Sequence, residues 1–191
     1  MNHCLLIRHG ETDLAGRFCG HSDPPLNRAG WLQVRRAIDL LADTAPEVIY
    51  TSDLQRARQT AQLIAERFGL SLNLRPDLCE ISFGEWEGLS WDEVEEQYPR
   101  QAKLWLEQYP LGAILSGEAF ELFRLRVRKE VDFLLEQAEN RPVVAVTHGG
   151  FICTALTEIY GVSMNLARAK SASYAALVPI ALAKQVSGAL A

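Results

Sequence analysis

Residues 4–12 read Cys4-Leu5-Leu6-Ile7-Arg8-His9-Gly10-Glu11-Thr12, so that an apolar run passes directly into charged and polar residues. A short apolar run of this kind predicts a buried strand over Cys4 to Ile7 that ends at a loop. In open α/β sheets, ligands bind in the crevice beyond the carboxyl ends of the strands, so Arg8 and His9 are expected to face a site. A histidine beside a permanent cation favours phosphoryl chemistry, although so short a motif also occurs by chance in ordinary polar loops.

The rest of the chain alternates strand-like and helical segments, which is typical of a mostly parallel sheet covered by helices on both faces. Strands are predicted over residues 4–7, 47–51, 72–74, 143–146 and 173–178. Asn27 and Asp53 are expected to cap two helices, and Gly69 is expected to end the second of them. A long helix is expected over 118–138. The pattern therefore predicts a three-layer α/β/α sandwich with a mostly parallel sheet.

Length and composition predict a single domain over residues 1–191. With 48% apolar content, 191 residues can build one sizeable core but are few for two. The less regular stretch from Pro76 to Gly117 carries three of the four tryptophans and short helical pieces at 91–97 and 102–108. We interpret this stretch as a lid-like insertion over the edge of the sheet.

Charge and cysteine content narrow the classes of partner and compartment. A net charge of −5 without a long Lys/Arg run argues against a nucleic-acid partner and leaves a local basic pocket for a small anion open. The four cysteines (Cys4, Cys19, Cys79 and Cys153) show no CxxC pairing, which favours neither a disulfide framework nor a zinc site. No signal or membrane-spanning segment is visible, so a cytoplasmic protein without membrane contact is expected. A homodimer is left open.

A second histidine and a second arginine are predicted at the same edge of the sheet. His148 follows the run at 143–146, and Arg56 lies in the first turn of the helix after 47–51. Guanidinium groups bind phosphate oxygens in bidentate fashion, so Arg8 and Arg56 suit a phosphate dianion. His9 can attack phosphorus as the neutral imidazole, which nearby arginines favour by disfavouring another positive charge.

The leaving oxygen of a phosphate ester needs a proton, which a carboxylic acid can supply. The segment from Leu78 to Gly88 offers Glu80, Glu85 and Glu87, and spacing alone does not choose among them. Anionic phosphate raises the pKa of a nearby carboxyl group and so favours its acid form. No HxH or HExxH spacing accompanies the histidines, so neither a metal ion nor another cofactor is expected.

Three segments together resemble the histidine phosphatase, or phosphoglycerate mutase-like, superfamily over essentially the whole chain. They are residues 8–12, Ser52 to Ala61 and Thr147 to Gly150, and their order and spacing agree as well. The resemblance implies a phosphoglycerate mutase-like fold and makes His9 the phosphorylated nucleophile. It further implies that Arg8, Arg56 and His148 clamp the phosphate. Glu80, rather than its neighbours, becomes the proton donor and later the base that activates water.

Within the superfamily, the segments Gly16 to Leu26, Leu78 to Gly88 and Ser116 to Phe120 are most similar to α-ribazole phosphatases, which act on a nucleotide precursor in the assembly of the lower loop of cobalamin. The resemblance implies a metal-independent phosphomonoesterase whose substrate is the small metabolite α-ribazole 5'-phosphate. Other sugar phosphates are the alternative substrates, because sugar phosphatases share close variants of these segments.

Thr12, Ser22 and Gly149 are the further residues expected at the substrate. One departure from the family concerns its usual Asn three residues after Thr12, where this chain has Ala15. A missing hydrogen bond of this kind costs on the order of 1–3 kcal/mol, which weakens a phosphate site without abolishing it. Ser22 or a water molecule is expected to replace the missing donor.

Two other functions are alternatives to this prediction. Phosphoglycerate mutases of the family resemble longer chains with more elaborate lids, so a mutase is the second choice among enzymes. A catalytically weak module that binds phosphorylated ligands is the alternative outside the enzymes, and Ala15 is its main support. The sequence does not identify the leaving group, and it does not tell whether the insertion closes over substrate.

Overall fold

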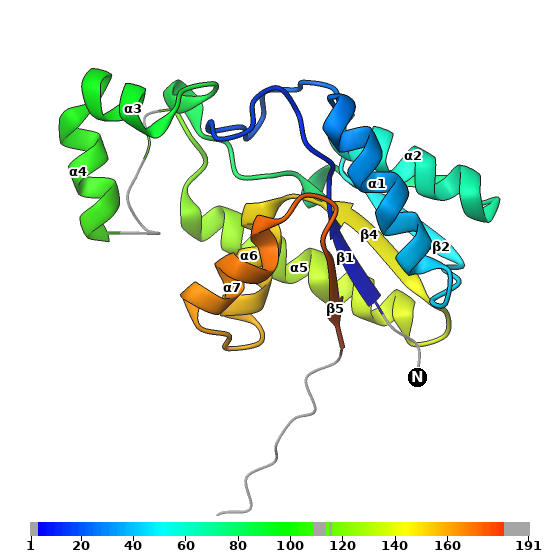
Figure 1. Ribbon diagram of the computed structural model, residues 1–191. Helices are drawn as coiled ribbons and strands as arrows, with labels where there is room; N and C mark the ends of the chain where they lie inside the picture. Colours follow the sequence, from blue (N-terminus) through cyan, green and yellow to red (C-terminus); the bar gives the residue numbers. More distant parts are fainter. Residues whose placement is uncertain (1–3, 109–113, 115, 182–191) are drawn as a thin grey trace, which may run out of the picture.

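The computed structural model describes residues 4–108, 114 and 116–181, and these residues contain a five-stranded sheet. The strands are β1 (Cys4–Arg8), β2 (Val48–Thr51), β3 (Leu72–Leu74), β4 (Val143–Thr147) and β5 (Leu177–Ile180). They lie in the order β3-β2-β4-β1-β5 (Figure 1). β1 to β4 are parallel to one another, and β5 pairs antiparallel with β1. The carboxyl ends of the four parallel strands therefore meet at one edge.

Helices cover both faces of this sheet. They are α1 (Arg28–Leu41) and α2 (Gln55–Phe68) on one face, and α5 (Phe120–Ala138), α6 (Gly149–Glu158) and α7 (Met164–Ala172) on the other (Figure 1). Successive side chains of a strand point to opposite faces, so β1 contributes to two cores. Leu5 and Ile7 pack with α1 and α2, whereas Cys4 and Leu6 pack with α5 and α6. The three-layer α/β/α sandwich predicted from the sequence is confirmed.

The start of α1 agrees with the sequence, and the start of α2 does not. Asn27 caps α1, because its side-chain oxygen accepts a hydrogen bond from the Gly30 amide at 2.8 Å. Asp53 does not cap α2, which begins after Leu54. The Asp53 carboxylate accepts instead from the Cys79 thiol at 2.9 Å, and the Asp23 side chain receives the Gln55 amide at the start of the helix. Asp23, from a loop distant in the sequence, therefore accepts the hydrogen bond at the start of α2 that Asp53 was predicted to accept.

Gly69 ends α2 as predicted, in a left-handed conformation with φ 68°. The last strand differs from the sequence prediction, which placed it over 173–178, because β5 begins at Leu177. Ala175 has φ 56°, outside the range of a strand, and its amide donates to the carbonyl of His9 at 3.2 Å. Residues 173–176 therefore turn over the end of β1 instead of extending β5.

The predicted insertion over 76–117 contains the short helices η1 (Pro76–Leu78) and η2 (Gly84–Trp86), followed by α3 (Trp91–Gln97) and α4 (Pro99–Gln108). In Figure 1, α3 and α4 stand apart from the sheet layers. Three tryptophans pack in the cluster that joins them to the loop carrying Phe18, so they serve as core. Residues 109–113 and 115 of this stretch lie outside the described residues, as do both ends of the predicted 1–191 domain. No helix within the described ranges is long and apolar enough to cross a bilayer.

Candidate active site

The predicted site residues gather at the carboxyl ends of β1 and β4. His9 directly follows β1 and His148 directly follows β4, and their ring centroids lie 5.1 Å apart. Arg56 reaches the same place from the first turn of α2, and its Nε lies 3.2 Å from Nε2 of His9. His9, Arg56 and His148 are all buried. The pairing of β1 with β4 therefore brings together segments that are far apart in the chain.

The hydrogen bonds of His9 determine its tautomer. Nδ1 lies 2.6 Å from the carbonyl oxygen of Gly10, which can only accept, so Nδ1 carries the proton. Nε2 is then the unprotonated nitrogen and accepts from Nε of Arg56. Burial lowers the pKa of His9 well below its usual range, and the positive charges of Arg56 and Arg8 lower it further. His9 is therefore a neutral imidazole whose Nε2 carries the lone pair, and burial contributes more to this state than the arginines do. Its role as the nucleophile stays a prediction.

Arg56 is fully buried and is held by the loop of residues 19–22. Its Nη1 donates to the carbonyl of Ser22 at 2.6 Å, and its Nη2 donates to the carbonyls of Gly20 and Cys19 at 2.7 and 3.1 Å. Through Nε it also orients His9. The role of Arg56 in a phosphate clamp stays a prediction, since the structure shows it binding this loop and the nucleophile.

Glu87 holds the same loop through hydrogen bonds to its backbone, a role that could not be predicted from the residue types. Its carboxylate accepts from the amides of Gly20, His21 and Ser22 at 3.1, 2.8 and 3.0 Å, and from the amide of Phe83 at 2.9 Å. Burial alone would raise the pKa of Glu87, but the donors from Phe83, His21 and Ser22 outweigh burial and lower it. Glu87 is therefore a positioning residue that acts on His9 through the loop and Arg56.

We expect Glu87→Gln to lower kcat about 10- to 100-fold, because a small displacement of positioning groups misaligns the nucleophile. Amides left without an acceptor should also reduce the free energy of unfolding by about 1–3 kcal/mol. Because the pKa of Glu87 is lowered in the fold, this stabilisation is present at neutral pH and is lost as the pH falls through that lowered value. Kinetics and denaturant unfolding at neutral and acidic pH check this. Glu85→Gln, at an exposed position, is the matched control. Equal kcat values and equal unfolding free energies for the two variants would show that Glu87 does not position the site.

Glu80 is the glutamate of the three that faces the cavity containing His9. It is 7% exposed, and its carboxylate accepts from the amides of Ile81 and Gly150 at 3.0 and 2.8 Å. Burial raises the pKa of Glu80, against the lowering effect of these two hydrogen bonds and of the arginines. A side chain on Gly150 would place its Cβ 2.3 Å from Oε1 of Glu80, so glycine is needed there. Burial therefore favours the acid form even without a bound phosphate.

Arg8 and His148 each have a buried side-chain nitrogen without a hydrogen-bond partner. Nη1 of Arg8 donates to the carbonyls of Ser171 and Ala172, and its guanidinium lies 4.1 Å from the centre of the Tyr174 ring, but its Nε has no partner. Nε2 of His148 lies 3.0 Å from the Ser52 hydroxyl. When that hydroxyl donates to Nε2, the proton of His148 resides on Nδ1, which also has no partner.

These two atoms are the buried side-chain nitrogen or oxygen atoms that lack a hydrogen bond among residues 4–108, 114 and 116–181. Buried polar groups are nearly always paired, so unpartnered donors at one site call for an acceptor. A phosphoryl group offers several acceptor oxygens to such donors. Arg8 and His148 therefore suit the phosphate clamp that the sequence predicted.

A cavity of about 360 Å³ lies over this edge of the sheet. Its wall includes His9, Glu80, Arg8 and two of the three predicted substrate residues, Thr12 and Gly149. The other predicted residues, Arg56, His148 and Ser22, are not in the wall: the first two are fully buried, and Ser22 contributes its carbonyl to Arg56.

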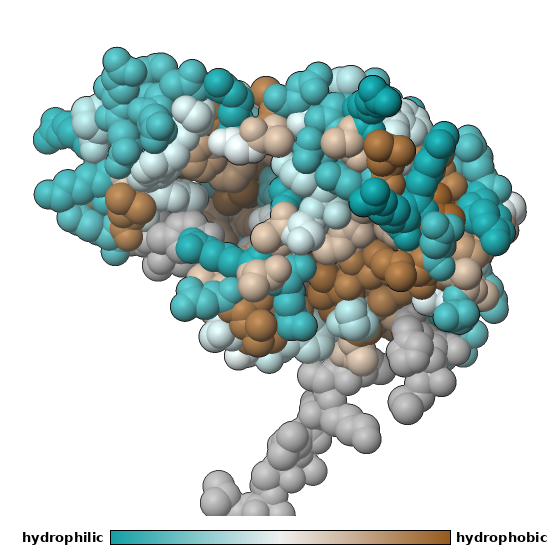
Figure 2. All heavy atoms as spheres, viewed as in Figure 1, coloured by the Kyte–Doolittle hydropathy of each residue, from teal (hydrophilic) through white to brown (hydrophobic). Residues whose placement is uncertain are grey.

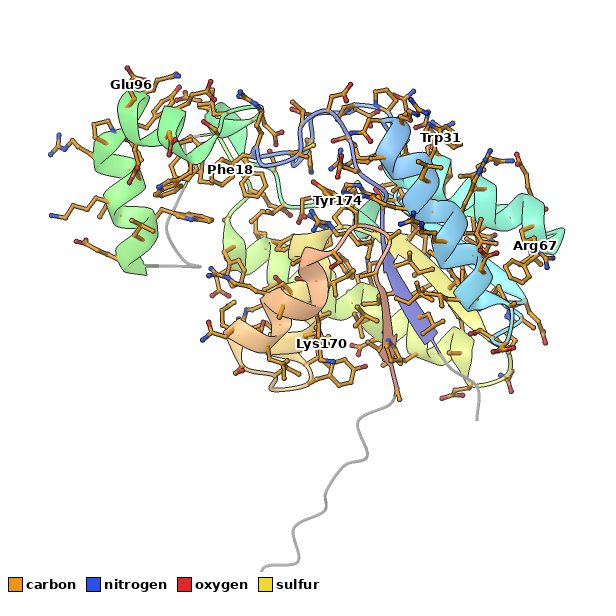
Figure 3. All side chains as sticks on the ribbon, in the orientation of Figure 1. Phe18, Trp31, Arg67, Glu96, Lys170 and Tyr174 are labelled. Atoms are coloured by element: carbon orange, nitrogen blue, oxygen red, sulfur yellow. The ribbon has the colours of Figure 1, made fainter. Side chains whose placement is uncertain are left out.

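The wall also contains residues that were not predicted at the site, among them Arg17, Arg168 and Tyr174. Tyr174, labelled in Figure 3, packs its ring 5.7 Å from that of His9. Its place in the wall was not predicted, because residues 173–178 have the sequence pattern of a strand. Ala15 is exposed and lies outside the wall, whereas Arg17, two residues later, lines the cavity.

The family model of the histidine phosphatase superfamily (branch 1) matches residues 4–186. The chain belongs to this superfamily. The superfamily recognised in the sequence motifs is thereby confirmed.

Three relatives show how far the likeness reaches. The chain is 36% identical over 147 residues to the bifunctional protein Rv2228c of Mycobacterium tuberculosis, a match that covers 75% of this chain and 40% of that protein. It is 28% identical over 158 residues to the adenosylcobalamin/alpha-ribazole phosphatase of Escherichia coli, covering 82% of this chain and 78% of the relative. The crystal structure of the alpha-ribazole phosphatase from Shigella flexneri has a TM-score of 0.83 over 95% of this chain and 91% of that chain, and at 24% identity this shows the shared fold.

Proposed function

We propose that this chain is a phosphomonoesterase that works through a phosphohistidine on His9 and uses no metal ion for the chemical steps. The observation that carries the proposal is the combination in one cavity of a neutral, oriented His9, a buried Glu80 that favours its acid form, and the unpartnered Nε–H of Arg8. Phosphoryl transfer asks the protein mainly to align a nucleophile and to neutralise charge on the phosphoryl oxygens. These groups supply both.

The reaction then has two steps on the same side chains. Nε2 of His9 gives its electron pair to phosphorus while the P–O ester bond breaks and the leaving oxygen takes the proton of Glu80. During attack, the Nε–H of Arg56 keeps its proton but changes its hydrogen-bond acceptor, from Nε2 of His9 to a phosphoryl oxygen. Water next attacks phosphorus, the P–N bond breaks with return of its electron pair to Nε2, and the Glu80 carboxylate takes a proton from the water.

For the substrate, we propose α-ribazole 5'-phosphate. Similarity to the Escherichia coli enzyme over 82% of the chain supports it, as does the apolar second cavity described below. A different sugar phosphate is the alternative, and Arg17 and Arg168 in the wall favour it because they suit polar or anionic leaving groups. We place the protein in the cytoplasm on the evidence of its four unpaired cysteines, which suit a reducing compartment.

Turnover on α-ribazole 5'-phosphate, phosphoglycerates and hexose phosphates tests this choice. We expect inorganic phosphate as the product and a preference in kcat/KM of at least about 100-fold for α-ribazole 5'-phosphate, equivalent to about 2.7 kcal/mol in the transition state. A similar preference for a hexose phosphate would replace the proposed substrate. Movement of phosphate between positions of phosphoglycerate, without its release, would instead identify a mutase.

A further inference from the structure

A second cavity of about 290 Å³ adjoins the first and shares part of its wall. The shared residues are Phe18, Phe83, Gly150 and Cys153. In Figure 2 the surface is hollowed between the lobe that carries α3 and α4 and the rest of the molecule, and apolar residues lie in the hollow. A molecule held in the first cavity by its phosphate can therefore extend into the second without crossing bulk solvent.

The wall of this second cavity is largely apolar and aromatic. It comprises Phe18, Ile81, Phe83, Trp105, Phe120, Phe123, Gly150, Cys153, Thr154, Thr157, Glu158 and Met164. Phe18 and Phe83 meet edge to face at 5.0 Å, and Trp105 packs edge to face on Trp86 at 5.6 Å. Aromatic rings fixed in this way give flat surfaces against which another ring can pack.

Two polar side chains of the wall, Glu158 and Thr157, are engaged within the protein. Glu158 pairs with Arg124 at 3.1 Å, and the hydroxyl of Thr157 donates to the backbone carbonyls of Cys153 and Thr154. The part of the wall that the structure describes includes no Lys, Arg or His. A carboxylate or second phosphate on the leaving group would therefore meet an acidic side chain and rings, without a cation to pair with.

We propose that the second cavity is the leaving-group site and that it selects phosphomonoesters whose alcohol carries an uncharged aromatic or alkyl group. This inference rests on the proposed function, because it assigns the phosphate to the first cavity. Its volume lies near the lower end of small-molecule sites, about 300 Å³, and suits one bicyclic ring. Phe120, Thr157 and Met164 line the second cavity alone and so set its specificity.

The test compares 2-(1-naphthyl)ethyl phosphate with ethyl phosphate, since both release a primary alcohol of similar basicity and differ in apolar bulk. We expect kcat/KM to be about 50-fold higher for the naphthyl ester, because its ring leaves water for the apolar wall. Thr157→Phe, which fills the cavity, should reduce this preference to below about 5-fold while ethyl phosphate turnover changes less than about twofold. Phe120→Ala, which removes a ring that α5 contributes to the wall, should also weaken this preference.

Leu122→Ala is the matched control for Phe120→Ala, because Leu122 lies on the same helix and is 63% exposed. Thermal unfolding shows whether each variant folds. An unchanged preference in both cavity variants, or equal hydrolysis of the two esters by wild type, would overturn the leaving-group site while the phosphatase proposal stands.

Binding of 2-(1-naphthyl)ethanol, followed by calorimetry on wild type and Thr157→Phe, reads the site without any catalysis. If neither ester is hydrolysed but the alcohol binds wild type and not Thr157→Phe, the proposed function fails and the leaving-group role with it, while the cavity stands as a site for uncharged aromatic groups. Equal binding of the alcohol by both proteins, or no binding, overturns the assignment.

Discussion

His9→Ala is expected to release inorganic phosphate at least about 10⁴-fold more slowly than wild type, because removal of a covalent nucleophile closes the two-step path. The remaining groups bind phosphate but have no atom to accept it. Rapid quench with a ³²P-labelled ester should show one equivalent of acid-labile phosphate on wild type and none on the variant.

The same variant needs a check on its fold, since His9 is buried and accepts a hydrogen bond from Arg56. Thermal unfolding and titration with inorganic phosphate provide it: a folded His9→Ala protein should still bind phosphate through Arg8 and His148. Turnover of folded His9→Ala at near the wild-type rate would refute the phosphohistidine mechanism, whichever substrate is natural.

Glu80→Gln should slow the hydrolysis of alkyl phosphates by about 10²- to 10⁴-fold, the usual contribution of a general acid. An ester of 2,4-dinitrophenol leaves without a proton, so its first step should be nearly unaffected. The second step still needs a base. The variant should therefore release one equivalent of dinitrophenol in a burst and then turn over slowly, with phosphate held on His9. Glu85→Gln, at an exposed position, is the control. If Glu80→Gln shows no burst, or if it hydrolyses both kinds of ester more slowly by the same factor, then Glu80 is not the general acid.

The pH dependence follows from the opposite shifts of the two groups. The lowered pKa of His9 keeps the imidazole neutral to lower pH than usual, and the raised pKa of Glu80 keeps the acid form to higher pH than usual. For alkyl phosphates, kcat/KM should fall on the acid side as His9 gains a proton and on the alkaline side as Glu80 loses one. Glu80→Gln should remove the alkaline limb and leave the acid limb in place.

The positions of His9 and His148 could be predicted because strand ends leave a clear pattern in the sequence. Each histidine follows a short apolar run, and the carboxyl ends of parallel strands share one edge. Glu80 could not be separated from Glu85 and Glu87 by spacing, and the family resemblance made the choice. Of the three glutamates, Glu80 is the one that lines the cavity with His9, whereas Glu85 is exposed and the Glu87 carboxylate accepts from the amides of residues 20–22.

What could not be predicted depends on contacts between loops that are distant in the chain. Arg56 is held by carbonyls of Cys19, Gly20 and Ser22, more than thirty residues away, and backbone acceptors leave no mark on the residue types around them. The start of α2 shows the same limit, because Asp23 takes the place that the adjacent Asp53 was expected to fill. The position of Tyr174 beside His9 could not be predicted for a different reason. Residues 173–178 have the composition of a strand, but they include a turn in which Ala175 is left-handed.

The two cavities are built by different parts of the chain. His9 is held by Gly10 at the end of β1 and by Arg56 of α2, and Thr60 of α2 holds Gly10 in turn. The residues that line the second cavity alone include Phe120, Thr157 and Met164 from α5, α6 and α7. Substitutions in those three helices can change which alcohol departs without shifting the imidazole or its partners. The fold thus offers a practical scaffold for engineering: a library confined to the second cavity should yield phosphatases for new esters that all retain one and the same phosphohistidine chemistry.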